Sequence, residues 1–159
     1  MSVEPVVRKQ GEGRALWMLD SLYEIMASSE ETGGELTAMR MTIPPGMGPP
    51  PHTHSGGESV FVLEGQLRYH IGNESYEAGP GAFFYVPAGT VENFEPVGDR
   101  PVRLLVIYTP GGIDKFFSEV GAPAERRELP PKSDEPPDME RLIQAGRKYG
   151  LEIQVPVES

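Results

Sequence analysis

The residues best suited to chemistry lie in a glycine- and proline-rich segment, GMGPPPHTHSGGESVFVLEG, at positions 46–65. His52 and His54 are two residues apart, and on a β-strand side chains at this spacing point to the same side, about 6.7 Å apart. Two imidazoles can therefore converge on one ion, and a glycine pair lets the chain turn so that the Glu58 carboxylate returns to the same point. This set suits Fe(II) best, and Mn, Ni, Zn, Co and Cu also fit.

The elements that must position these side chains are short strands separated by turns. Glycine and proline make up 19 and 17 of the 159 residues, which disfavours a helical bundle. Stretches rich in β-branched and aromatic residues lie between the turns and are predicted as strands. They are residues 36–43, 60–63, 67–71, 83–86 and 102–108. Their spacing leaves no room for crossover helices, so we expect an all-β, closed or double-sheet architecture.

Two helices are predicted near the C-terminus. Apolar residues at i, i+3, i+4 and i+7 indicate a helix over residues 112–120. A second helix should begin after Asp138 and stop at Gly150. Between them lies a Pro-rich connector, and an alternating stretch at Leu151, Ile153 and Val155 follows them as a strand or arm. We expect one domain: residues 1–34 as N-terminal strands or arm, 35–110 as the barrel, and 111–159 as helices and connector.

Composition excludes several classes of function. Fourteen Lys and Arg against 24 Asp and Glu give a formal net charge of −10, which disfavours nucleic acid and anionic membranes as partners. The chain has no Cys, so disulfides and thiolate sites are excluded. The apolar runs are too short to span a bilayer, and the N-terminus carries no apolar signal core. We expect a soluble, cytoplasmic protein.

His-Thr-His alone can also occur by chance in a surface loop, but its surroundings form a longer pattern. Gly46, five residues, His52-x-His54, three residues, Glu58, six residues and Gly65 resemble the first motif of the cupin superfamily. A second segment, Gly81 followed by five residues and Pro87-x-Gly89, resembles the opening of the second cupin motif. The chain is similar to small single-domain cupins of the quercetin-dioxygenase-like group. The resemblance implies a jelly-roll β-barrel with a metal near one mouth, and a homodimer.

The second motif departs from the family pattern at two positions. Glu92 stands where the family places its fourth metal ligand, a His, and Pro96 stands where it usually has Asn. The resemblance implies His52, His54 and Glu58 as metal ligands. Glu92 can be the fourth ligand, a general base on a bound water or substrate, or an ion-pair partner of a histidine in a degenerate site.

Bulky side chains on the predicted strands are candidates for the core and for a substrate pocket. Alternation sends about half of them inward, and an apolar pocket with Met walls favours a small apolar or aromatic ligand. The candidates are Met39, Met41, Phe61, Tyr69, Tyr85 and Phe94, with Phe83 and Phe84 as neighbours. His70 lies on the polar side of its strand and is interpreted as an exposed or rim histidine.

Three functions fit these residues. The first is a metal-dependent enzyme, a dioxygenase-type oxidoreductase with Glu92 as ligand or catalytic base. The second is a non-catalytic module that holds a small apolar ligand, with a weak or degenerate metal site. Isomerase or lyase chemistry at the same metal is a third. The N-terminal apolar stretches, 15–19 and 22–27, could exchange between subunits as an edge strand.

Overall fold

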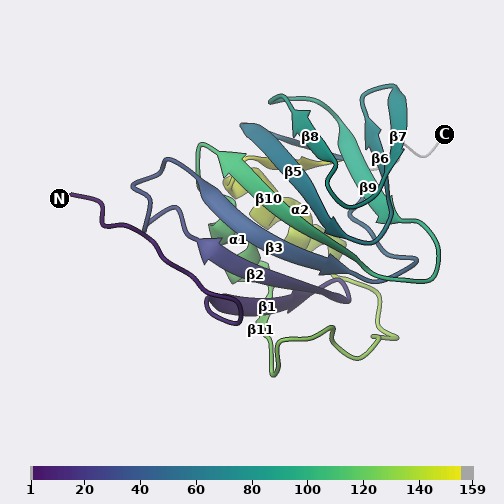
Figure 1. The fold of residues 1–159 in the computed structure, drawn as a ribbon, viewed down its shortest axis with the longest axis horizontal. Coiled ribbons are helices and arrows are strands. Elements are labelled where there is room, and N and C mark those ends of the chain that lie inside the picture. The colour runs from purple at the N-terminus through teal and green to yellow at the C-terminus, as the bar shows by residue number, and fades with distance from the viewer. Residues whose placement is uncertain (1, 155–159) are drawn as a thin grey trace.

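The computed structural model describes residues 2–154, in which twelve strands and two helices are assigned. The strands form two antiparallel sheets, of seven and five strands, that enclose the core between them (Figure 1). The fold is an all-β jelly roll with short C-terminal helices, so the predicted fold class is confirmed.

The seven-stranded sheet holds most of the long strands. Its order is β11 (Ala122–Pro123), β1 (Arg14–Met18), β2 (Ser21–Ala27), β3 (Thr37–Ile43), β10 (Val102–Thr109), β5 (Gly57–Glu64) and β8 (Phe83–Val86). The order of the five-stranded sheet is β12 (Leu151–Ile153), β4 (His52–His54), β9 (Glu92–Pro96), β6 (Leu67–Ile71) and β7 (Glu74–Ala78). The helices are α1 (Asp114–Val120) and α2 (Met139–Lys148).

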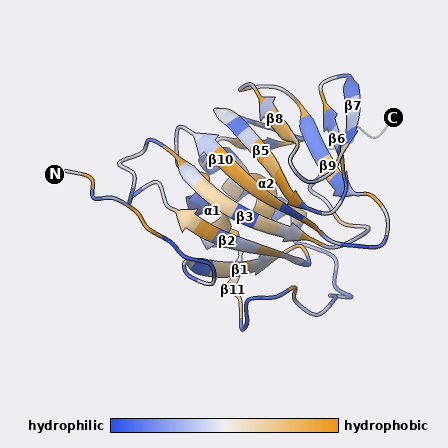
Figure 2. Ribbon diagram, viewed as in Figure 1, coloured by the Kyte–Doolittle hydropathy of each residue, from blue (hydrophilic) through white to orange (hydrophobic). Residues whose placement is uncertain are grey.

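All five strands predicted from apolar runs are present, and β6 and β8 have the predicted limits. Alternation explains the inward residues, since Val102, Leu104, Val106 and Tyr108 of β10 are buried and the residues between them are half-buried. β7 was not predicted, because four of its five residues are exposed and polar character on both faces hides the two-residue period. Figure 2 shows the same contrast between hydrophobic β5 and β10 and hydrophilic β7.

The C-terminal helices begin close to the predicted positions. Asp138 caps α2, and its carboxylate accepts a hydrogen bond from the Arg141 backbone nitrogen at 3.1 Å. Phe116 and Phe117 of α1 are buried against the barrel. β12 forms the first part of the predicted arm, and Val155 lies outside the described residues.

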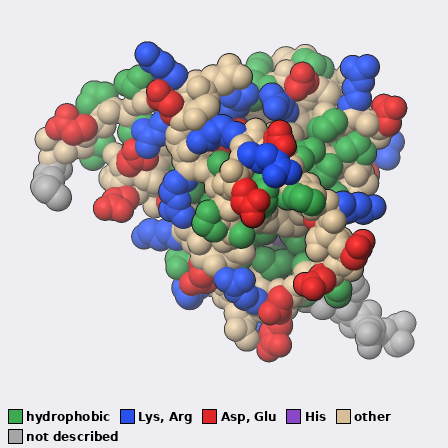
Figure 3. Space-filling view, turned by 90° about the horizontal axis from the view of Figure 1, so that it is seen from below, with side chains coloured by type: hydrophobic (Ala, Val, Ile, Leu, Met, Phe, Trp, Pro, Cys, Tyr) green, Lys and Arg blue, Asp and Glu red, His purple; other side chains and the backbone are tan. Residues whose placement is uncertain are grey.

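The N-terminal apolar stretches become β1 and β2 and pair within the chain. β2 lies between β1 and β3, so the two strands extend the seven-stranded sheet. Exchange of this segment between subunits stays a prediction. At seven and ten residues, both helices in the described part of the chain are too short to cross a membrane. On the face shown in Figure 3, acidic and basic side chains are interspersed.

Candidate metal centre

Both histidines of the His-Thr-His segment point inward from β4. His52 and His54 are buried, and their ring centroids are 4.8 Å apart with the ring planes nearly perpendicular. The strand is only three residues long and is held mainly from one side, since β12 pairs with all three of its residues and β9 with one. The absence of a side chain at Gly48 lets the preceding loop lie against the Phe94 carbonyl oxygen of β9.

Glu58 enters the site from β5, after the predicted glycine turn. A side chain at Gly56 would collide with the Thr109 carbonyl oxygen, so the turn needs glycine there to lie against the end of β10. The Glu58 carboxylate is buried, and its Oε2 atom lies 3.2 Å from Nε2 of His54. Tyr108, its register partner on β10, faces the same space and packs against the His54 ring at 5.0 Å.

Glu92 completes the group from β9, directly opposite His52 in the strand register. Its side chain is 1% exposed, and Oε1 lies 3.6 Å from Nε2 of His52. The same oxygen accepts a hydrogen bond from the Tyr69 hydroxyl at 2.8 Å. Tyr69 is fully buried and its ring lies between Phe84 and Phe94, at centroid distances of 5.0 and 5.5 Å. This packing fixes the position of the Tyr69 hydroxyl and, through the hydrogen bond, that of the Glu92 carboxyl group.

One ligand atom from each of the four residues lies within 4.8 Å of the other three. Opposite ligands of one transition-metal ion are about 4 Å apart, so a small contraction would bring all four to bonding distance. Nε2 of His54 and Oε2 of Glu58 are buried without a hydrogen-bond partner among the described residues. Buried polar atoms are rarely left in this state, and a metal ion between them would satisfy both. The donor set therefore fits a divalent transition metal.

The protonation states of the histidines favour metal binding. Burial, with a smaller contribution from His54, lowers the pKa of His52 to about 4, and burial also lowers the pKa of His54. Both imidazoles are therefore neutral near pH 7, which is the form that binds metal. Nδ1 of His52 lies 2.8 Å from the Pro50 carbonyl oxygen, which can only accept. Nδ1 thus carries the proton, and the Nε2 lone pair faces the cluster.

The pKa values of the two buried carboxyl groups are raised, whereas those of the histidines are lowered. Burial and the neighbouring Glu58 raise the pKa of Glu92 to about 9. Burial also raises the pKa of Glu58, and hydrogen bonds with Glu92 and Tyr108 oppose part of that rise. Two carboxylates this close cannot both be ionised cheaply without a cation. A divalent ion would therefore displace a proton when it binds.

A cavity of about 60 Å³ opens next to the cluster. Of the predicted pocket residues, Met41 and Phe94 line it. Met39 and Tyr69 are fully buried but belong to the core, where Tyr69 supports Glu92. Phe61 and Tyr85 are 39% and 58% exposed on the outer face of β5 and β8, so alternation sends them away from the cavity. His70 also lies at the surface, one third exposed, as predicted.

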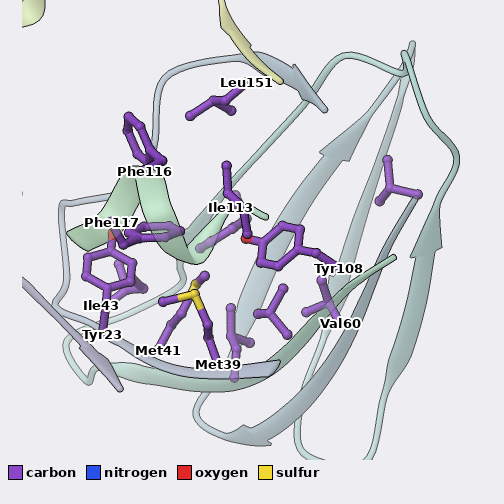
Figure 4. Close-up of a cluster of buried hydrophobic side chains, with 14 of the residues drawn as sticks. Tyr23, Met39, Met41, Ile43, Val60, Tyr108, Ile113, Phe116, Phe117 and Leu151 are labelled. Atoms are coloured by element: carbon purple, nitrogen blue, oxygen red, sulfur yellow. The ribbon is translucent and has the colours of Figure 1, made fainter. Parts of the chain in front are cut away.

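Several residues near the cluster were not anticipated as functional. Tyr108 was predicted only as part of a strand. Phe116 and Phe117 (Figure 4), with Leu142, form part of the cavity wall but were predicted only as packing surface. Tyr69 was predicted as a pocket residue, but its hydroxyl contact with Glu92, 23 positions away, was not anticipated. A signal was available for Tyr69, because the polar end of an inward-facing Tyr must find a partner.

Residues 39–108 match the family of cupin domains. They form a cupin domain. The assignment confirms the resemblance based on the two sequence motifs, and the matched region includes all four residues of the cluster. It excludes the N-terminal strands β1 and β2 and the whole C-terminal segment after Tyr108.

Among curated relatives, the chain is similar to a quercetin 2,3-dioxygenase from Bacillus subtilis, with 29% identity over 127 residues. The match covers 79% of this chain but only 37% of that enzyme's length. A predicted oxalate decarboxylase from Thermotoga maritima has a similar structure, with a TM-score of 0.62, 18% identity, and coverage of 65% of this chain and 98% of its own. An RmlC-like cupin from Shewanella frigidimarina matches with a TM-score of 0.58 and 16% identity. This match covers 67% of the present chain and 93% of that protein. These two structures support the fold alone.

Proposed function

We propose that this cupin binds a divalent transition metal through His52, His54, Glu58 and Glu92 and is a dioxygenase-type enzyme acting on a small apolar or aromatic molecule. The observation that carries the proposal is a pair of buried atoms, His54 Nε2 and Glu58 Oε2, which lie 3.2 Å apart and form no hydrogen bond with each other or with any other described residue. Leaving both desolvated without partners costs free energy that a bound cation would recover.

When bound, the metal would supply Lewis acidity and, if it is Fe or Mn, redox chemistry with O₂. The residues of this chain prepare the site for it. The Pro50 carbonyl holds His52 in the tautomer that presents Nε2, and the Tyr69 hydroxyl orients Glu92. Two carboxylates and two neutral imidazoles neutralise a divalent charge, which favours the harder metals Mn and Fe over Cu.

The proposal assigns Glu92 as the fourth ligand rather than as a free base. Its ligand atom belongs to the same group as those of the histidines and Glu58, and the Tyr69 hydrogen bond keeps it there. The dioxygenase activity and the apolar substrate are supported by the similarity to quercetin 2,3-dioxygenase and by the aromatic and aliphatic residues of the cavity. Oxygen consumption with a panel of phenols and flavonols tests the activity.

A second candidate function is a non-catalytic module that holds a small ligand. The cavity wall favours it: among the described residues, the only side chains outside the metal cluster that could transfer a proton there are Tyr23 and Tyr108, and burial raises the pKa of both hydroxyls. Binding of a panel phenol without turnover, after reconstitution with each of the six candidate metals, would support this second function over the first.

Metal content decides the ligand assignment. We expect about one metal ion per chain in the purified protein, a large loss in Glu92→Ala, and retained or tighter binding in Glu92→His. His70→Ala is the matched control, because His70 is half-buried on the outer face of β6 and should leave the metal content unchanged. Elemental analysis measures the metal content of the wild-type protein and of the three variants. An unchanged metal content in Glu92→Ala would show that Glu92 is not a ligand.

We further propose that the protein is a cytoplasmic homodimer, and that its three segments, residues 1–34, 35–110 and 111–159, act as arm, metal-binding barrel and cap. The family resemblance supports the dimer. Light scattering after size exclusion at several concentrations would test it, and a molecular mass of one chain at all concentrations would contradict it.

A further inference from the structure

The cavity beside the metal centre has walls of two different origins. The inner wall comes from the cupin domain itself and includes Met41, Phe94 and Tyr108. The outer wall comes from segments beyond residues 39–108. It consists largely of Phe116 and Phe117 of α1, Leu142 of α2, and Leu151 and Ile153 of β12. Figure 4 draws the buried hydrophobic side chains, with Phe116, Phe117 and Leu151 toward one side of the group and Met39 and Val60 toward the other.

The outer wall is held firmly against the histidine strand. Leu151 and Ile153 are the register partners of His54 and His52, so the residues that close the cavity share a ladder with the two imidazoles. Two further backbone hydrogen bonds flank this ladder, from Ser55 to Gly150 at 2.8 Å and from Gln154 to Pro51 at 2.8 Å. The outer wall is therefore connected to the histidine strand by the backbone hydrogen bonds of one sheet.

The cavity offers no cationic side chain to a ligand. Among the described residues no Lys or Arg lines it, and outside the metal cluster the only side-chain hydroxyls in its wall are those of Tyr23 and Tyr108. With Glu58 and Glu92 both ionised, a divalent ion and its four ligands would together carry no net charge. A carboxylate ligand would lose its hydration there and gain no counter-charge. An uncharged molecule that places one oxygen against the metal or against a tyrosine hydroxyl avoids this desolvation cost.

The volume of the cavity sets a limit on size. An apolar cavity of about 150 Å³ holds benzene, so about 60 Å³ is less room than one aromatic ring needs and far less than two rings need. The flexible side chains of Met18 and Met41 line the space and can yield to a somewhat larger ligand. Leu142, Leu151 and Ile153 are branched and anchored on α2 and β12, so they resist a second ring.

We propose that the substrate of this cupin is an uncharged, largely hydrocarbon molecule of no more than one aromatic ring, and that the segment α2–β12 sets this limit. This inference deepens the proposed function and rests on it for the role of the metal. The cupin domain provides the metal ligands, and Leu142 and Ile153 are specificity-determining residues outside it.

Binding of three probes tests the proposal. Phenol is uncharged near pH 7, benzoate is an anion of similar size, and 2-naphthol adds a second ring. Calorimetric titration of the full-length protein, both metal-loaded and metal-free, should show that phenol binds at least about tenfold more tightly than benzoate and 2-naphthol, a discrimination typical of apolar pockets. Benzoate or 2-naphthol binding as tightly as phenol would overturn the proposal, as would the absence of phenol binding in both forms.

Variants of the outer wall test which residues set the limit. Leu142→Ala and Ile153→Ala should each improve 2-naphthol binding relative to phenol by about tenfold, because each removes branched carbon atoms from the wall. Leu104→Ala is the matched control: Leu104 is fully buried in β10 but does not line the cavity, so the ratio should stay unchanged. If the alanine variants do not fold, Ile153→Val removes one methyl group and should shift the ratio in the same direction. An unchanged ratio in the folded wall variants would overturn the role of α2–β12.

The two proposals can fail separately. If elemental analysis finds no metal and none can be loaded, the proposed function fails, while the metal-free titrations still decide the charge and size limits. If metal is bound and benzoate competes equally with phenol, the substrate inference fails and the metal site stands.

Discussion

The inner and outer faces of strands β6 and β9 carry similar residue types in opposite surroundings. On the inner face, Tyr69 and Glu92 are almost completely buried and join the histidine cluster. On the outer face, Nε2 of His70 lies 3.3 Å from Oε1 of Glu95, and its Nδ1 lies 2.7 Å from the Ser75 hydroxyl. Both groups therefore contain a histidine near a carboxylate.

The difference lies in solvation and in partners. The outer His70 and Glu95 side chains are 33% and 40% exposed, and both nitrogens of His70 have partners. In the inner cluster Nε2 of His54 and Oε2 of Glu58 are buried 3.2 Å apart without forming a hydrogen bond, and neither has another hydrogen-bond partner in the described part of the chain. A histidine near a carboxylate therefore does not by itself define a metal site. Desolvated lone pairs that converge without other partners do define one, because only there does a cation replace an unsatisfied state.

The largest expected effect is the loss of the inner histidines. His52→Ala and His54→Ala should each weaken metal binding by more than roughly a hundredfold, beyond the range seen when only a supporting residue is removed. Competition with a chromophoric chelator measures the affinity. His70→Ala on the outer face should leave it unchanged, and an equal loss in all three variants would remove the distinction between the two faces.

The hydroxyl of Tyr69 should have the next largest effect. Tyr69→Phe removes the hydrogen bond to Oε1 of Glu92 and should weaken metal binding about 10- to 100-fold, as expected for a group that orients a ligand. Tyr76→Phe is the matched control, because Tyr76 is the register partner of Tyr69 on β7 and is 46% exposed. The absorption spectrum of the Co(II)-loaded protein should change in Tyr69→Phe alone. Identical spectra and affinities in both variants would show that Glu92 needs no support from Tyr69.

The inner face should also give stability a characteristic pH dependence. In the metal-free protein Glu92 has a pKa of about 9, raised from an unfolded value near 4.5, so its contribution to stability is full below pH 4.5 and declines as pH rises toward 9. His52, with its pKa lowered to about 4, contributes stability that is full above pH 6.5 and declines as pH falls toward 4.

A metal that displaces the Glu92 proton should therefore raise the melting temperature more at pH 8.5 than at pH 6. The difference in Tm between metal-loaded and metal-free protein measures this directly. In Glu92→Gln, which has no proton to lose, any remaining increase in that difference should be smaller. A metal-induced shift in Tm that is constant from pH 6 to 8.5 in the wild-type protein would contradict the predicted competition between proton and metal.

The smallest effect should come from the outer carboxylate. Glu95→Gln removes the charge that faces His70 and Arg68 at 3.3 and 3.6 Å. These pairs are exposed and screened by solvent, so the free energy of unfolding should fall by less than about 1 kcal/mol. Urea denaturation measures the change. A loss of several kcal/mol, or any loss of metal, would mean that the two faces are coupled.

The amino-acid pattern predicted the strands whose two faces differ, the capped helix α2, and the grouping of His52, His54 and Glu58 as candidate ligands. These features are local: alternation, capping and the i, i+2 spacing depend on neighbours within a few residues. It missed β7, whose residues are polar on both faces, and it left the role of Glu92 open, because Glu92 lies 34 residues beyond Glu58 in the chain.

The folded structure was needed to show which inward residues reach the histidine cluster. Alternation could not tell that Tyr69 would support Glu92 while Phe61 and Tyr85 would face outward, since a shift of one residue in register reverses every side chain of a strand. Nor could it place Leu142 and Ile153 over the cavity, about 90 to 100 positions beyond the histidines. Such contacts depend on how the C-terminal segment pairs with β4, and that pairing is a property of the folded barrel as a whole.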